Sequence, residues 1–179
     1  MANLKLKATS GGSVSFVNGD TASDLTVTFP AVTGTAMVSG NMPAFSATKS
    51  ATQTVTSGVF TTVTFDVEQF DTNNNFASNT FTPTVDGYYQ INLSVYCASS
   101  ATTTRLIAQI LKNGSSYRFG TDVTQAASSE SRSFVSTVVY MNGTTDYLTA
   151  VALPIGTGTL TFGNLIDNTC FNGVLVRAA

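Results

Sequence analysis

The chain has 179 residues, of which 42% are hydrophobic and only 10% are charged, with a formal net charge of −2 and no histidine. So small a charge argues against binding to nucleic acid or to an anionic membrane, and the hydrophobic fraction argues against a disordered chain. The lack of histidine removes the commonest metal ligand and the commonest general base. Chains poor in charge and rich in Thr and Ser form strands whose edges are hidden by closing a sandwich or by assembling into oligomers.

Residues 1–42 are expected to form a short, β-rich N-terminal arm. Three of its segments have the residues of short strands: Val14–Val17, Leu25–Phe29 and Ala36–Val38. So few large apolar side chains cannot support a core alone. We therefore expect the arm to pack on its symmetry mates, on the main domain or on a larger particle. Nothing at its start has the form of a secretory signal.

The main domain, residues 43–179, is predicted around one strand, Tyr88–Cys97. Its residues alternate strictly, and one face is made of core residues: Tyr89, Ile91, Leu93, Val95 and Cys97. The other face is more polar but includes Tyr88 and Tyr96. A tyrosine has a large apolar ring with a polar tip, so these two side chains suit a contact between subunits.

Turn signals divide the rest of the domain into further strands. We expect strands at Ala44–Ala47, Val59–Phe65, Arg105–Lys112, Ser116–Phe119, Arg132–Met141, Tyr147–Leu153 and Phe171–Val176. Asn113-Gly114 and Asn142-Gly143 are hairpin signals. Residues 98–104 and 121–131 are predicted as connections, the second a long polar loop. Roughly eight to ten short strands with regular turns predict an all-β fold, an antiparallel β-sandwich or jelly roll.

The arm resembles segments of bacteriophage tail-fibre and virion structural proteins. The similar stretches are Gly11–Phe16 and Thr21–Thr35. In those proteins such segments precede a C-terminal globular knob, which is the order expected here.

The main domain resembles the complement globular-head family, whose jelly roll is related to the tumour necrosis factor fold. Five stretches carry the resemblance, in the family's order: Ala44–Ala47, Val63–Asp66, Phe81–Tyr89, Lys112–Gly114 and Phe171–Val176. The chain departs from the family at Asn142–Tyr147, where a Gly-Asp pair is common. The resemblance implies a compact homotrimer with the central aromatic strand near the threefold axis, and it places Tyr88 and Tyr96 at the trimer interface.

Chemistry that would support catalysis or a cofactor is sparse. Asp71–Asn75 begins like a calcium loop, but Phe76 stands where a glycine is needed and Thr82 where a bidentate glutamate is needed, so a polar loop is favoured. Cys97 and Cys170 lack a histidine base and read as buried thiols, although a disulfide between them stays possible. We expect no enzyme, no cofactor and no metal.

Ligand binding, if there is any, is expected on the polar loops. Tyr117 and Tyr140 are candidate stacking platforms for a surface glycan, and Thr124 and Gln125 are candidate polar contacts. The alternative is that these segments are solvated connections.

The sequence is interpreted as a bacteriophage structural protein, located in the virion and assembled in the host cytoplasm. The favoured role is a homotrimeric decoration protein that binds other virion proteins through residues 1–42, because the chain has no long shaft. The alternative is a short tail-fibre or head-fibre knob that binds a host-surface receptor or polysaccharide.

Overall fold

The computed structural model describes residues 4–7, 9–16, 37–38, 40, 42–163 and 168–179. The chain forms two compact units, Met1–Gly34 and Thr35–Ala179. The predicted boundary between residues 42 and 43 lies inside the second unit. Each unit is described by itself.

The first unit contains an antiparallel pair of strands, β1 (Leu4–Lys7) and β2 (Ser13–Phe16). β2 corresponds to the strand predicted at 14–17, and β1 was not predicted. The register pairs apolar residues with each other and polar residues with each other: Leu4 with Phe16, Leu6 with Val14, Lys5 with Ser15 and Lys7 with Ser13. The strand predicted at 25–29 lies outside the described residues, and at Met37–Val38 the described backbone is not strand.

The second unit is built from strands that pair antiparallel throughout the described residues. They are β3 (Ala44–Thr48), β4 (Gln53–Val55), β5 (Thr61–Thr62), β6 (Val67–Asp71), β7 (Phe76–Ala77), β8 (Thr80–Phe81), β9 (Asp86–Lys112), β10 (Ser115–Asn142), β11 (Leu148–Thr157), β12 (Leu160–Phe162) and β13 (Cys170–Ala178). Within the described part of the chain no helix is long and apolar enough to cross a membrane.

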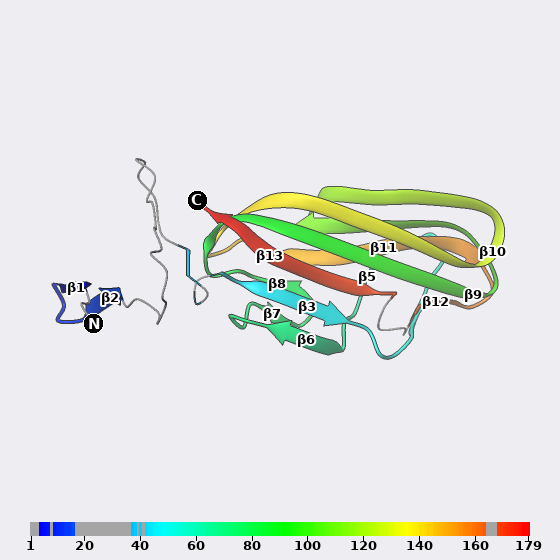
Figure 1. Cartoon of the computed structure of the whole chain (residues 1–179). Helices are drawn as coiled ribbons and strands as arrows, with labels where there is room; N and C mark the ends of the chain where they lie inside the picture. The colour runs from blue at the N-terminus through cyan, green and yellow to red at the C-terminus, as the bar shows by residue number, and fades with distance from the viewer. Residues whose placement is uncertain (1–3, 8, 17–36, 39, 41, 164–167) are drawn as a thin grey trace, which may run out of the picture. The chain divides into compact units, whose positions relative to one another are not determined.

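The strands form two layers (Figure 1). The front sheet, nearest the viewer, has the order β6-β3-β13-β9-β10 and uses the first half of β9 with the second half of β10. In the back sheet, the second half of β9 lies between β11 on one side and the first half of β10 on the other. β8 and β5 add to β11. The all-β sandwich predicted from the sequence is confirmed.

The two long strands pass from one sheet to the other, which corrects the prediction of connections at 98–104 and 121–131. Both strands double back at the right-hand end of Figure 1, and their ladder continues through the bend with shifts in register around Ser128. There Thr103 pairs with Ser128, and Ser99 Oγ donates to the carbonyl of Thr157 at 2.6 Å. Thr and Ser were interpreted as loop formers, but Thr suits strands and the hydroxyls satisfy the backbone at the bend.

The predicted core face of the central strand is confirmed. Tyr89, Ile91, Val95 and Cys97 are fully buried and Leu93 is 1% exposed. They face a cluster of phenylalanine rings in which Phe45 stacks on Phe81, with centroids 4.3 Å apart, and meets Phe171 edge-on at 5.1 Å. Such pairs stabilise a core beyond their buried area.

One of the two hairpin predictions is correct. Asn113 and Gly114 have φ values of 53° and 76° and join β9 to β10, as a type I′ turn requires. Asn142-Gly143 is not a hairpin, because β10 and β11 do not pair with each other. This turn instead carries the chain from the front sheet to the back sheet.

Strand lengths were predicted less well near residues 59–77. Of the strand expected at Val59–Phe65 only Thr61–Thr62 is regular, and β6 and β7 were not predicted. The two carboxylate oxygens of Asp71 accept hydrogen bonds from the backbone N–H of Asn73 and Phe76 at 3.3 and 2.7 Å, which is the geometry of a polar turn.

Candidate functional site

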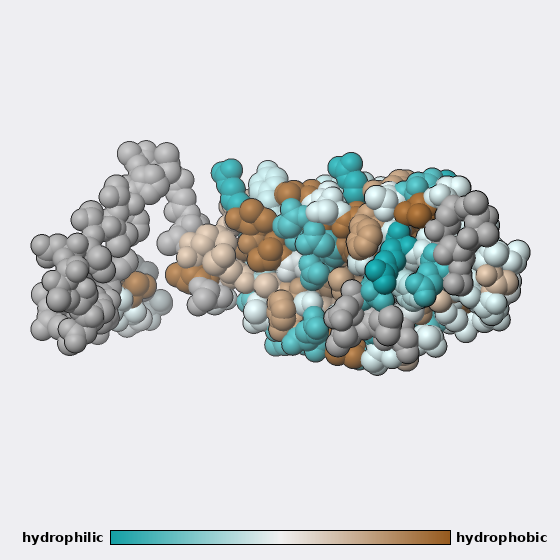
Figure 2. Space-filling view, turned by 45° about the vertical axis from the view of Figure 1, so that its right-hand side comes forward, coloured by the Kyte–Doolittle hydropathy of each residue, from teal (hydrophilic) through white to brown (hydrophobic). Residues whose placement is uncertain are grey.

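The outward side of the front sheet is the most distinctive surface of the second unit. Sheets that face water are usually polar on that side, yet six large side chains here are exposed by 41% to 54%: Phe70, Tyr88, Phe134, Val138, Tyr140 and Val174. They come from β6, β9, β10 and β13 and occupy outward positions of the strand alternation. We call this surface the front face. Figure 2 shows apolar and polar groups alternating across the unit in patches.

Tyr88 and Tyr140 form an aromatic pair on the front face. They are directly opposite each other on β9 and β10, and their ring centroids are 5.5 Å apart. Tyr88 is 43% exposed, so a large part of its surface is open to solvent. The predicted trimer contact of Tyr88 remains a prediction, and the structure leaves its side chain available for it.

Tyr96, the second tyrosine predicted at the interface, is covered by its own chain. It is only 7% exposed. Arg132 lies over the Tyr96 ring, with Cζ 5.4 Å from the centroid. The backbone carbonyl of Tyr96 accepts a hydrogen bond from Gly163 N–H at 2.9 Å. Burial raises the pKa of its phenol. Tyr96 therefore has little area left for a subunit contact.

A polar strip crosses the middle of the front face. Ser46, Asn172, Asn92 and Ser136 lie at the same level of four neighbouring strands, β3, β13, β9 and β10. Asn92 Nδ2 donates to Asn172 Oδ1 at 3.1 Å, and Ser136 Oγ donates to Asn92 Oδ1 at 2.9 Å. Gln90 Nε2 joins the strip through Ser136 Oγ at 3.0 Å.

An open pocket of about 440 Å³ lies at one end of the strip, where β3, β6 and β13 meet. Its walls are mostly apolar and include Phe70 and Val174, while Ser46 and Asn172 supply its polar groups. The pocket is thus part of the front face and not a separate cleft.

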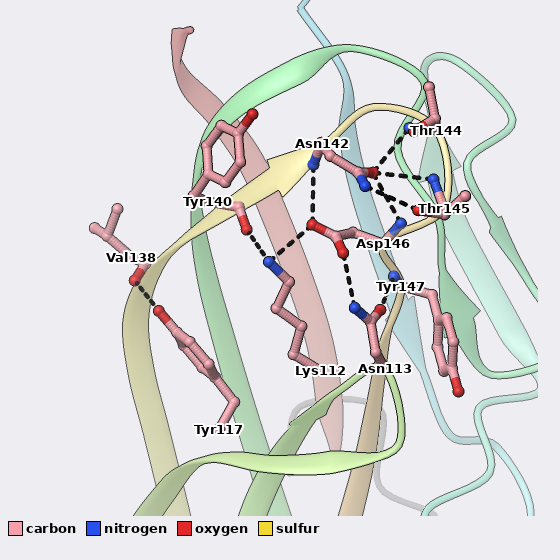
Figure 3. Close-up of polar contacts among 10 residues, drawn as sticks. All are labelled: Lys112, Asn113, Tyr117, Val138, Tyr140, Asn142, Thr144, Thr145, Asp146 and Tyr147. Carbon is pink, nitrogen blue, oxygen red and sulfur yellow. Dashed lines mark hydrogen bonds and ion pairs between the residues drawn. The ribbon is translucent and has the colours of Figure 1, made fainter.

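Next to Tyr140, a network of charged and polar side chains around Lys112 and Asp146, which we call the hub, joins the two turns at this end of the unit (Figure 3). Lys112 Nζ lies 2.8 Å from Asp146 Oδ2 and donates to the carbonyl oxygen of Tyr140 at 2.6 Å. Asp146 Oδ1 accepts from Asn113 Nδ2 at 2.7 Å. The Asn113 amide and then Lys112 lower the pKa of the Asp146 carboxyl, which stays ionised and buried.

Asn142 completes the hub. Its Oδ1 accepts hydrogen bonds from the backbone N–H of Thr144, Thr145 and Asp146 at 2.9 to 3.0 Å. Its own N–H donates to Asp146 Oδ2 at 3.0 Å. The Asn-Gly signal therefore marks a turn that the asparagine side chain stabilises, rather than a hairpin.

The four candidate ligand residues are not brought to one place. Tyr117 and Tyr140 lie near each other, because Tyr117 Oη donates to the carbonyl of Val138 at 3.1 Å (Figure 3). Thr124 is exposed on β10, seven residues and up to about 23 Å along the strand from Tyr117 at roughly 3.3 Å per residue. The side chain of Gln125 lies outside the described residues. Ligand binding by these residues remains a prediction.

The structure shows both cysteines as free thiols. Burial raises the pKa of Cys97 to about 11 and raises the pKa of Cys170. Among the described residues no group of three His, Cys, Asp or Glu side chains could hold a metal ion.

Sequence reasoning missed most of the front face. Alternation along Arg132–Met141 already places Phe134, Val138 and Tyr140 on one side, opposite the buried Val135 and Val139. That signal was available. The polar strip could not be found, because it depends on which strands are neighbours.

Comparison with known proteins shows the fold and no family. No protein-family model and no curated protein matches the sequence. Solved structures do match: the globular domain of a zebrafish complement 1qA protein has 19% identity and a TM-score of 0.54, covering 76% of this chain and 99% of that one.

Two further matches belong to the tumour necrosis factor group. Murine APRIL at pH 8.5 has 9% identity and a TM-score of 0.53, over 75% of this chain and 99% of its own. Eiger TNF from S. frugiperda has 8% identity and a TM-score of 0.55, over 77% of this chain and 93% of its own. The chain thus has the jelly-roll fold of these proteins, as expected from the five stretches.

Proposed function

We propose that the chain is a non-enzymatic structural protein that assembles as a homotrimer through its front face. The observation that carries the proposal is the set of exposed apolar and aromatic side chains around Tyr88 and Tyr140 on a sheet face that would otherwise be polar. The shared fold adds support, because the resemblance to complement globular heads implies a compact trimer.

Burial of this face is the main gain expected from assembly. Aromatic residues are enriched at the centres of interfaces and charged residues are depleted there. The outward alternation Phe134, Ser136, Val138, Tyr140 on β10 has this composition. Removing such surface from water contributes about 25 cal/mol per Å² before the entropy lost on association is subtracted.

The more specific proposal places the trimer on a bacteriophage particle, as a surface-exposed decoration protein attached to the capsid through residues 1–42. It is supported by the resemblance of the arm to virion structural proteins and by the pairing of β1 with β2 into a ribbon too small to hold a core. The alternative is a short tail-fibre or head-fibre knob that binds a host-surface receptor or polysaccharide.

Two measurements test these proposals separately. Light scattering after size-exclusion chromatography of the full chain gives its mass in solution, and a monomer at micromolar concentration overturns the trimer. Gold-labelled antibody against residues 44–179, imaged on intact phage particles, tests the placement. Label spread over the head supports decoration, label confined to the tail supports the fibre knob, and absence of label overturns both.

A further inference from the structure

We propose that the polar strip, through Gln90, Asn92, Ser136 and Asn172, determines the register in which copies assemble on the front face. The inference rests on the proposed trimer. It adds that the apolar residues supply the attraction, while the amides of the strip select one geometry.

The position of the strip is the first argument. Asn172, Asn92 and Ser136 are paired across β13, β9 and β10, so they form one continuous row in the middle of the sheet. Apolar side chains flank the row on both sides: Val138 and Val174 next to Gln90, and Phe134 next to Ser94. An interface that buries these flanks also buries the row.

The hydrogen bonding of the strip is the second argument. Within the chain, Asn92 Oδ1 accepts from both Ser136 and Gln90, and Asn92 Nδ2 donates to Asn172 Oδ1. Gln90 Oε1 has no donor among the described residues. Asn172 Nδ2 has only a 4.0 Å contact with Cys170 Sγ. Within the described part of the chain, each strip therefore has one acceptor without a donor, Gln90 Oε1, and one donor with only a weak contact, Asn172 Nδ2.

A strip with a spare donor and a spare acceptor is complementary to the same strip of a second copy. In the proposed trimer, each copy would donate from Asn172 to Gln90 of the next copy and accept from the previous one. A shift in register would bury these groups without partners, at about 1–3 kcal/mol for each. A buried polar group selects one oligomeric state in coiled coils through the same penalty.

The test replaces the strip without removing the apolar flanks. In the variant Asn92→Val/Asn172→Val, Gln90 and Ser136 keep the hydrogen bond between them, and valine suits a strand. We expect this variant to assemble, but native mass spectrometry should show several oligomeric states where the wild type shows only trimer. Thr149→Val on β11 of the back sheet adds a similar apolar group away from the front face and should stay trimeric.

A second variant with a smaller change tests the strip even if the double variant does not fold. Gln90→Met removes only the unused acceptor and the bonds of one partly exposed side chain. We expect subunits to exchange about five- to tenfold faster, as the loss of one intersubunit hydrogen bond predicts. The exchange is monitored by mass spectrometry after the protein is mixed with isotope-labelled wild type.

The outcomes separate the two proposals. A monomeric wild type overturns both the trimer and the strip. A trimeric wild type with a purely trimeric double variant, or with unchanged exchange in Gln90→Met, overturns the role of the strip and leaves the trimer intact.

Discussion

Tyr88 and Tyr140 are opposite one another on β9 and β10, with ring centroids 5.5 Å apart, and both rings are open to solvent. Lys112 contacts one member of the pair: its Nζ donates to the carbonyl of Tyr140 and lies 5.7 Å from the centroid of the Tyr140 ring. Lys112 in turn is anchored by Asp146. The backbone at Tyr140 is thus tied to the Lys112–Asp146 ion pair, which links this end of the front face to the turn at Asn142.

Replacing Tyr88 with Asp should dissociate the trimer. An unpaired carboxylate buried at the interface is strongly unfavourable. We expect Tyr88→Asp to elute as a folded monomer, with the mass of one chain in light scattering, at concentrations where the wild type is trimeric. The matched control is Phe119→Asp, which changes an exposed aromatic residue on β10 that contacts Phe60 and is not on the front face. A trimeric Tyr88→Asp would place the interface elsewhere.

Replacing Asp146 with Ala should destabilise the whole second unit. The carboxylate is buried and accepts from Asn113, Asn142 and Lys112, so its loss removes three polar interactions that join the two turns. We expect the free energy of unfolding to fall by about 3 kcal/mol, measured by urea denaturation. The control Asp122→Ala breaks the exposed ion pair with Arg105 and should cost less than about 1 kcal/mol. Equal losses would contradict the structural role of the hub.

Acid should weaken the fold through the same residue. The hydrogen bond from Asn113 and the contact with Lys112 hold the pKa of Asp146 below its ordinary value of 3.8. A carboxyl with a lowered folded-state pKa contributes its full stability above the unfolded-state pKa and loses it as the pH falls through the folded-state pKa. Thermal unfolding followed from pH 6 to pH 2 should therefore show a smaller acid loss in Asp146→Asn than in the wild type. Asp66, whose pKa is also lowered, remains in both proteins and cancels in the difference.

The sequence predicted the parts of the fold that depend on local alternation. Tyr89 and Leu93 fall on the buried face because a strand repeats every two residues, and Asn113-Gly114 forms its hairpin because both residues adopt positive φ. The bends inside β9 and β10 were predicted as loops. Their strand character depends on ladder partners that are distant in the sequence, such as Thr102 with Thr157.

The candidate site was predicted only in part for a similar reason. Alternation places Tyr88 and Tyr96 on the same side of β9, but it cannot reveal that Arg132 and Gly163 cover Tyr96. The polar strip required knowledge that β13 lies beside β9. Exposure and strand order are tertiary properties, so the sequence gives candidates for the site but not their surroundings.

Cys97 should be unreactive in the folded protein. It is fully buried, and burial raises the pKa of its thiol to about 11, so the reactive thiolate is scarce at neutral pH. We expect iodoacetamide at pH 8 to label Cys97 only after denaturation, as measured by mass spectrometry of tryptic peptides. Cys170 is partly exposed and serves as the internal comparison, with faster labelling. Labelling of Cys97 at the rate of Cys170 would show that the core opens there.

Enlarging Gly163 should test whether Tyr96 has a structural role instead of a role in assembly. A β-carbon at Gly163 would lie 2.1 Å from Cδ1 of the Tyr96 ring, so even alanine must displace that ring. We expect Gly163→Ala to lower the free energy of unfolding by about 2 kcal/mol in urea denaturation, as overpacking of a core commonly does. The mass of the assembled protein should not change, because Tyr96 is covered by its own chain and has little area left for a subunit contact. Gly12→Ala in the first unit, where a β-carbon meets nothing within 4 Å, should leave both the stability and the mass unchanged. A Gly163→Ala protein of wild-type stability that no longer forms trimers would return Tyr96 to the interface.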